Sequence, residues 1–203
     1  MIGIIEYGVG NIKSVENAVK YFDASIQVDL VDDADKLKDY DKIILPGVGA
    51  FEDAMNKIRD RNFDQAIKEE ADKGKHILGI CLGMQLLASK SYEFGEFEGL
   101  DLIPGEVVKF ESEILSIPHM GWNNVHFEKE GPLFNEIEND SDFYFVHSFH
   151  YQCTNPDHGI GSTEYGVDFT SIVNKDNVFG AQFHPEKSQM KGLQFVNNFI
   201  TLS

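Results

Sequence analysis

The sequence predicts an α/β fold with a mostly parallel central sheet that is flanked by helices. Residues 2–5 and 42–45 form short, predominantly apolar runs, which are typical of strands buried on both faces. Between them, residues 12–22 carry apolar side chains at helical spacing. Because strands that alternate with helices usually pair in parallel through right-handed crossovers, this alternation indicates a parallel sheet.

Each element of the first half follows from its local pattern. Strands are expected over residues 2–5, 26–31 and 42–45, and helices over residues 12–22 and about 51–59. Asn11 is a good N-cap for the first helix, since its side chain can accept a hydrogen bond from a free amide of the first turn. The acidic segment 32–41 is expected to be a solvated connection.

The second half of the chain changes character and is rich in short β-like runs with turn signals. Strands are expected over residues 105–110, 123–127, 142–151, 159–165, 169–174 and 178–183. These strands are expected to be antiparallel additions to the parallel core. A C-terminal helix over about residues 188–202 closes a single domain that spans residues 1–203, without repeats.

The composition bounds the partners of the protein. The chain has 203 residues, 42% of them hydrophobic, and 16 are Phe, so it can bury a substantial core. Its formal net charge is −17, which excludes the basic surface of a nucleic-acid binder and disfavours anionic membranes. Neutral or basic partners are expected instead.

The cysteine content and the N-terminus indicate a cytoplasmic protein. Only Cys81 and Cys153 are present, which favours a reducing compartment over a disulfide framework. Residues 1–6 carry no basic lead, and no apolar run approaches membrane-spanning length, so neither a signal peptide nor a membrane segment is expected. The histidines show no metal-ligand spacing. Neither a metal nor a cofactor is predicted.

Cys81 stands where a strand-like run meets a helix-like run. Gly79 and Gly83 flank it in a G-x-C-x-G pattern, the cysteine version of the strained turn that presents a nucleophile between a strand and a helix. The N-terminus of the following helix favours the thiolate, which is the attacking form. The alternative is a buried core cysteine, which is the commonest fate of a free Cys.

A candidate base lies about a hundred residues downstream. His184 and Glu186 are two positions apart in the run FGAQFHPEKS, and on a strand end this spacing points both side chains the same way. A cysteine nucleophile needs a base and a group that orients the base. A lone His is usually structural, but together with the Cys81 turn the pair predicts a Cys-His-Glu triad.

These motifs identify a resemblance to a known family. The chain resembles the class I (triad) glutamine amidotransferases, whose fold is flavodoxin-like, and within them the glutaminase subunits of imidazole glycerol phosphate synthases. The resemblance rests on EYGVGN at residues 6–11, LPGVG at 45–49, GICLGMQ at 79–85, PHMGWN at 118–123, FVHS at 145–148 and HPEKS at 184–188. It covers the chain from end to end.

The resemblance implies an enzyme with a defined set of site residues. Cys81, His184 and Glu186 would hydrolyse glutamine to glutamate and ammonia. The peptide of Gly47 and Val48 and the N–H of Leu82 would form the oxyanion hole. The alternative for the glycine-rich loop that contains Gly47 and Val48 is a simple turn. The residues implied to contact the glutamine are Gly49, Gln85, Glu93, Ser148 and Phe149, although Glu93 could equally belong to a plain acidic loop.

The resemblance also implies a partner, a (β/α)8-barrel cyclase that uses the ammonia to make imidazole glycerol phosphate and an aminoimidazole carboxamide ribotide in histidine biosynthesis. Interface residues would be Asn11, His119, Trp122, Tyr144 and Lys187, each of which has an ordinary structural alternative. Three other functions stay open: a paralogous glutaminase for surface-polysaccharide amidation, a stand-alone cysteine hydrolase, and a non-catalytic binding module.

Overall fold

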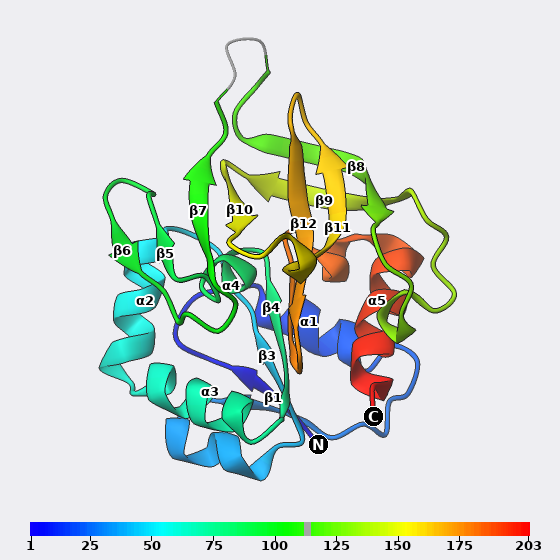
Figure 1. The fold of residues 1–203 in the computed structure, drawn as a ribbon. Coiled ribbons are helices and arrows are strands. Elements are labelled where there is room, and N and C mark those ends of the chain that lie inside the picture. Colours follow the sequence, from blue (N-terminus) through cyan, green and yellow to red (C-terminus); the bar gives the residue numbers. More distant parts are fainter. Residues whose placement is uncertain (112–114) are drawn as a thin grey trace.

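The computed structural model describes residues 1–111 and 115–203 (Figure 1). Its centre is a parallel sheet in the order β2-β1-β3-β4-β13. These strands are β1 (Ile2–Ile5), β2 (Val28–Val31), β3 (Lys42–Leu45), β4 (His76–Ile80) and β13 (Val178–Ala181). The structure therefore confirms the predicted α/β class.

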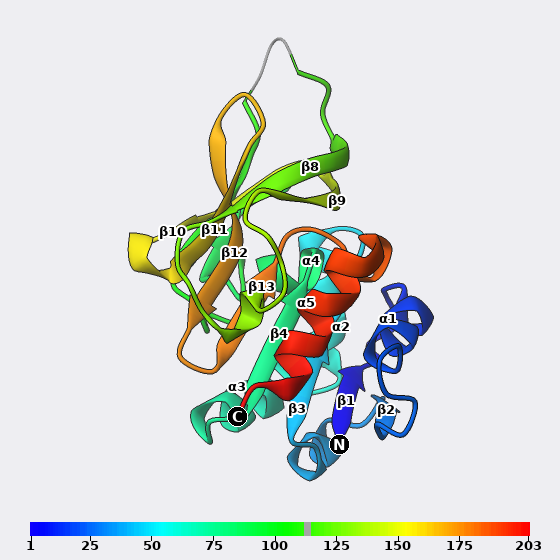
Figure 2. The same ribbon diagram turned by 90° about the vertical axis from the view of Figure 1, so that its right-hand side faces the viewer.

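Helices cover both faces of this sheet (Figure 2). One face packs on α1 (Ile12–Val19) and α5 (Gln189–Thr201), and the other packs on α2 (Phe51–Asp60), α3 (Phe63–Asp72) and the 3₁₀ turn η1 (Ala34–Asp39). Alternate residues of the strands divide between the faces: Ile44 belongs to the α1 and α5 core, whereas Ile43 and Leu45 belong to the other core. Burial on both faces explains why these strands are continuously apolar.

Beyond β13 the sheet continues with mixed and antiparallel strands, which form the upper part of the molecule in Figure 1. These are β12 (Asp168–Lys175), β10 (Phe149–Cys153), β7 (Gly105–Lys109), β5 (Lys90–Ser91) and β6 (Phe97–Glu98), with β11 (Gly159–Glu164) and the pair β8 (His119–Phe127) and β9 (Ser141–His147) off this path. Short helical turns are α4 (Leu82–Gln85), η2 (Pro132–Phe134), η3 (Pro156–His158) and η4 (Pro185–Lys187).

The β8–β9 pair packs on the central sheet through aromatic side chains. Phe143 stacks on Phe183 with ring centroids 4.1 Å apart, and Phe195 of α5 closes the same cluster. His184 N–H donates to the Tyr144 carbonyl at 2.9 Å. These contacts fix β9 above the carboxyl ends of β4 and β13, as Figure 2 shows.

Two buried histidines connect β8 to β9. His119 Nδ1 lies 3.0 Å from His147 Nε2, and His147 Nδ1 lies 2.8 Å from the Phe149 carbonyl oxygen. Because a carbonyl only accepts, His147 carries its proton on Nδ1, and Nε2 accepts from His119. Burial lowers the pKa of His147 to about 3 and that of His119 to about 4, so both rings are neutral.

The turn after β4 requires glycine for steric reasons. A Cβ on Gly83 would lie 1.9 Å from the Leu45 carbonyl oxygen, and one on Gly79 would lie 2.5 Å from the Gly83 oxygen. Cys81 between them has φ 53° and ψ −111°, a conformation that non-glycine residues rarely adopt. The predicted elbow is therefore present in the backbone.

Several local expectations were wrong. The helix predicted over residues 12–22 ends at Val19, and Asn11 occupies the N-cap position without a side-chain capping bond. The strand predicted over 142–151 is broken at Ser148 into β9 and β10. The acidic segment 32–41 contains η1, because its apolar residues Leu37 and Tyr40 are buried. Helix α3 and the short strands β5 and β6 were not predicted.

The helices of the protein are short or amphipathic. Within residues 1–111 and 115–203, no helix combines the length and the apolar character needed to cross a membrane.

Gly83→Ala should destabilise the protein severely, because the added methyl group would meet the backbone of β3 rather than a movable side chain. We expect a loss of about 3 kcal/mol or more in the free energy of unfolding, at the upper end for overpacking. Gly131→Ala is the matched control: a Cβ there meets nothing within 4 Å, and the change should stay within about 0.5 kcal/mol. Urea unfolding of both variants measures the difference. Equal stabilities would contradict the steric explanation.

The neutral His119–His147 pair should make the protein less stable in acid. Their folded pKa values lie below the ordinary value of 6.5, so between about pH 6.5 and 4 unfolding takes up protons, and stability falls as the pH falls. In His119→Gln unfolding should take up as much as one proton fewer over this range, so the free energy of unfolding should depend less steeply on pH. Urea unfolding at a series of pH values measures this slope. An unchanged slope would show that His119 is not held neutral by the fold.

Candidate active site

Three neighbouring parallel strands bring the predicted site together. β3 is followed by the loop 46–49, β4 by Cys81, and β13 by the segment that contains His184. Because all three strands are parallel, their carboxyl ends meet at one edge, which is where α/β sheets carry their sites. Cys81 and His184 are about a hundred residues apart in the sequence, and the pairing of β4 with β13 brings them together.

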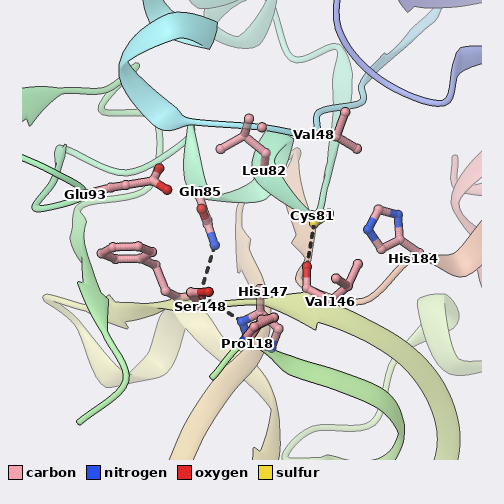
Figure 3. A pocket seen from close by; sticks show the side chains of 12 residues that line it. Val48, Cys81, Leu82, Gln85, Glu93, Pro118, Val146, His147, Ser148 and His184 are labelled. Carbon is pink, nitrogen blue, oxygen red and sulfur yellow. Dashed lines mark hydrogen bonds between the residues drawn. The ribbon is translucent and has the colours of Figure 1, made fainter. Parts of the chain in front are cut away.

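A cavity of about 320 Å³ lies at this edge (Figure 3). Its volume is sufficient for a small ligand. The residues lining it are Val48, Gly49, Cys81, Leu82, Gln85, Glu93, Pro118, Val146, His147, Ser148, Phe149 and His184. Seven of the residues predicted to be catalytic or to contact glutamine are therefore around one cavity: Cys81, His184, Gly49, Gln85, Glu93, Ser148 and Phe149.

Cys81 presents its sulfur to this cavity from the elbow. The residue is 6% exposed, and its backbone N–H donates to the Ala181 carbonyl of β13 at 2.8 Å. Its Sγ lies 3.9 Å from the Val146 carbonyl oxygen, to which the thiol donates. The helix that follows, α4, is a single turn over Leu82–Gln85, and the N–H groups of Met84 and Gln85 donate to the Cys81 carbonyl.

His184 and Glu186 form a buried pair beside Cys81. His184 Nδ1 donates to Glu186 Oε1 at 2.9 Å, and each side chain is 2% exposed. Burial alone would lower the pKa of His184, but the interactions with Cys81 and Glu186 outweigh it and raise the pKa to about 9. His184 Nε2 is buried and has no hydrogen-bond acceptor among the described residues. The ring therefore lies near the Cys81 sulfur without a hydrogen bond to it.

The geometry of the His-Glu pair differs from the prediction in one respect. β13 ends at Ala181, and the two residues lie at the start of the 3₁₀ turn η4 rather than on a strand end. Pro185 is the first residue of this turn, where the absence of an N–H is tolerated. The tight turn, instead of strand alternation, brings the carboxylate back to the imidazole.

The loop after β3 approaches the elbow closely. A Cβ on Gly47 would lie 2.8 Å from the Gly83 nitrogen, so no other residue fits there without a shift. The buried Tyr7 hydroxyl donates to the Pro46 carbonyl at 2.8 Å and holds the loop in place. Val48 lines the cavity from this loop, and Leu82 lines it from α4. Because Leu82 is the first residue of α4, its N–H has no partner within the helix.

Gln85 and Glu93 reach the cavity through different elements. Gln85 Nε2 donates to the Phe149 carbonyl oxygen and to Gln182 Oε1, each at 3.0 Å, which leaves Oε1 as the end that can accept from a ligand. Glu93 accepts from the Phe51 N–H at 2.7 Å and thus caps α2, while burial raises its pKa. The capping role was not foreseen.

Sequence reasoning missed several residues of the site. Pro118, Val146 and His147 line the cavity, although they were quoted only as parts of motifs. Gln182 is fully buried, and its Nε2 lies 3.9 Å from Cys81 Sγ. Only its position two residues before His184 could have signalled this contact.

The predicted interface residues divide into two groups. Trp122 is 49% exposed and packs edge-on against Tyr144, and Lys187 Nζ lies 5.9 Å from the Tyr144 ring. Asn11 is exposed as well. His119, in contrast, is 3% exposed and stacks on Phe145, so its side chain is buried beneath this surface.

The reason is strand parity. Trp122, taken as a turn residue, lies within β8, and successive side chains of a strand point to opposite faces. Residue 119 is therefore on the inner face when residue 122 is on the outer one.

Within the described residues, no group of three or more His, Cys, Asp or Glu could hold a metal ion.

Comparison with known proteins identifies the family of the chain. The family model "Glutamine amidotransferase class-I" matches residues 3–202. A protein of Sulfurimonas denitrificans, "Imidazole glycerol phosphate synthase subunit HisH", is 51% identical over 98% of this chain and 97% of its own length. A protein of the same name from Methanocaldococcus jannaschii is 47% identical over the whole of both chains.

Solved structures agree at the level of the fold. The structure of PurLQS from Thermotoga maritima has a TM-score of 0.76 at 20% identity and matches 98% of this chain and 96% of that chain. A glutamine amidotransferase from Thermotoga maritima has a TM-score of 0.66 at 17% identity, over 98% and 81%. The match over residues 3–202 and the near-complete similarity to the relatives show that the chain belongs to the class I glutamine amidotransferase family.

Proposed function

We propose that this chain is the glutaminase subunit of an imidazole glycerol phosphate synthase, and that it hydrolyses glutamine to glutamate and ammonia. The observation that carries the proposal is the buried His184–Glu186 pair beside the Cys81 elbow, with Cys81 and His184 both lining one cavity. Relatives that are 51% and 47% identical over nearly their full length carry that name. The catalytic unit is the whole of residues 1–203.

His184 takes the proton of Cys81, and the thiolate attacks the side-chain amide carbon of glutamine. Glu186 accepts from Nδ1, which leaves Nε2 as the basic nitrogen. The raised pKa of His184 allows the ring to hold this proton until the leaving nitrogen needs it. The N–H groups of Val48 and Leu82 stabilise the negative oxygen that develops.

His184 then protonates the leaving nitrogen, and ammonia departs while the glutamyl group stays on the sulfur as a thioester. Water, deprotonated by the same ring, attacks the thioester, and glutamate is released. During these steps Gln85 Oε1 and the Glu93 carboxylate accept hydrogen bonds from the nitrogens of glutamine. Gly49, Ser148 and Phe149 border the same cavity and contact the bound glutamine.

The partner in this proposal is a (β/α)8-barrel cyclase that consumes the ammonia and makes imidazole glycerol phosphate and an aminoimidazole carboxamide ribotide. Trp122, Tyr144, Lys187 and Asn11 would meet it, because they are solvent-accessible and aromatic residues are preferred at interfaces. The names of the relatives favour histidine biosynthesis over polysaccharide amidation. Two free cysteines and a charge of −17 suit a cytoplasmic enzyme without nucleic-acid or membrane partners.

Cys81→Ala should abolish glutamine hydrolysis, because the nucleophile is lost, while synthesis by the complex with added ammonia continues. The test is a glutaminase assay with and without the barrel cyclase and its nucleotide ligand, with glutamine or an ammonium salt as nitrogen source. Cys153→Ala is the matched control and should retain hydrolysis. Residual hydrolysis near the wild-type rate in Cys81→Ala would refute the assignment of the nucleophile.

Glu186→Gln should lower kcat less than His184→Ala does. The base transfers protons itself, whereas the carboxylate only orients and charges it, and in comparable triads the two losses differ by about two orders of magnitude. Steady-state kinetics of both variants in the complex give the order. If Glu186→Gln proved the more damaging, the roles of base and orienting group would have to be exchanged.

A further inference from the structure

Gln182 contacts the sulfur of the nucleophile. It follows β13, is fully buried and does not line the cavity. Its Nε2 lies 3.9 Å from Cys81 Sγ, and its Oε1 accepts from Gln85 Nε2 at 3.0 Å. Its backbone N–H donates to the Ser171 carbonyl of β12 at 2.8 Å, so both the main chain and the side chain are fixed.

The hydrogen-bond pattern determines which end of the Gln182 amide faces the sulfur. The Phe149 carbonyl can only accept, so Gln85 must point its Nε2 toward it. The second hydrogen of that Nε2 then faces Gln182, whose nearest atom must be its oxygen. The amide nitrogen of Gln182 is thereby directed at Cys81 Sγ, and the reverse orientation would break this chain of donors.

The buried histidines strengthen the start of this chain. His147 Nδ1 donates to the same Phe149 carbonyl at 2.8 Å, and His147 receives a hydrogen bond from His119. Asn123 Nδ2 lies 3.3 Å from His119 Nε2 and continues the series along β8. The carbonyl that orients Gln85 is therefore held by a second donor with a defined tautomer.

The sulfur thus lies between one acceptor and one donor. The Val146 carbonyl, 3.9 Å away, can only stabilise the thiol, whereas the Gln182 N–H can stabilise the thiolate. When His184 removes the proton, the attraction between the sulfur and the Val146 carbonyl becomes repulsion. The hydrogen bond from Gln182 to the sulfur becomes stronger, since a hydrogen bond to a charged acceptor is shorter and stronger than one to a neutral acceptor.

We propose that Gln182 is a further catalytic residue, which donates a hydrogen bond to the Cys81 sulfur and stabilises its thiolate, with Gln85 as the residue that orients it. The inference rests on the proposed function, in which Cys81 is the nucleophile. It gives Gln85 a second task besides contact with the substrate.

The test is the alkylation of Cys81 by iodoacetamide as a function of pH, in a Cys153→Ser background. Gln182→Met removes the donor to the sulfur, together with the acceptor of Gln85 Nε2, and keeps the length of the side chain. The midpoint of the pH profile should rise by about one unit, and alkylation at neutral pH should slow about tenfold, as expected for the loss of one hydrogen bond to a charged group. In the complex kcat for glutamine should fall by a similar factor with KM unchanged.

Thr163→Val is the matched control. Thr163 is 3% exposed and donates to Ser171 Oγ at 3.0 Å, so this variant loses a buried side-chain hydrogen bond too, but none to the sulfur. Its pH profile should be that of the wild type. A profile for Gln182→Met equal to that of the control would overturn the proposal. Alkylation reads the sulfur without a substrate, so failure of the proposed glutaminase activity is distinguishable from failure of this inference.

A second measurement covers the case in which Gln182→Met does not fold. In wild-type protein with ¹⁵N-labelled glutamine side chains, the amide protons of Gln182, identified by their proximity to the Cys81 Cβ protons, should shift when Cys81 ionises. They should not titrate in this way in Cys81→Ala, and those of the exposed Gln152 should not respond. A Gln182 amide that is insensitive to the ionisation of Cys81 would overturn the proposal.

Discussion

The close approach of Gly83 to the Leu45 carbonyl determines most of this site. The approach brings the turn after β4 against the end of β3, where a single added Cβ would be 1.9 Å from the carbonyl oxygen. It forces Cys81 into a backbone conformation that costs on the order of 1–3 kcal/mol. The cost is offset by the surrounding structure, which includes the bond from the Cys81 N–H to Ala181 and those from Met84 and Gln85 to the Cys81 carbonyl.

Three histidines close to one another show how environment separates their roles. His184 has a carboxylate and a thiol as neighbours, and they raise its pKa to about 9 despite burial. His119 and His147 are also buried, but their hydrogen-bond partners are each other, a carbonyl and the neutral Asn123 amide, so burial lowers the pKa of each well below 6.5. Groups of one type that are shifted in opposite directions are a common basis for dividing acid-base work from structural work.

The sequence was informative where local sterics decide the structure. The glycines around Cys81 and the apolar runs of β1 and β3 predicted the elbow and the parallel sheet, because each depends on neighbours in the chain. The burial of His119 was not foreseen, because the strand was expected to begin at residue 123 and the alternation was not extended backward over β8. Gln182 and Val146 contact the sulfur only through the pairing of distant strands, which no local pattern encodes.

Strand β9 connects the exposed surface with the chemistry. Tyr144 contacts Trp122 on the outer face, while its carbonyl accepts from the His184 N–H at 2.9 Å and its N–H donates to Ser188 Oγ, which in turn donates to the His184 carbonyl. Two residues further along, the Val146 carbonyl meets the Cys81 sulfur. One strand therefore sets the positions of both the base and an acceptor for the nucleophile. The Trp122–Tyr144 surface is thus joined to both groups through the backbone of a single strand.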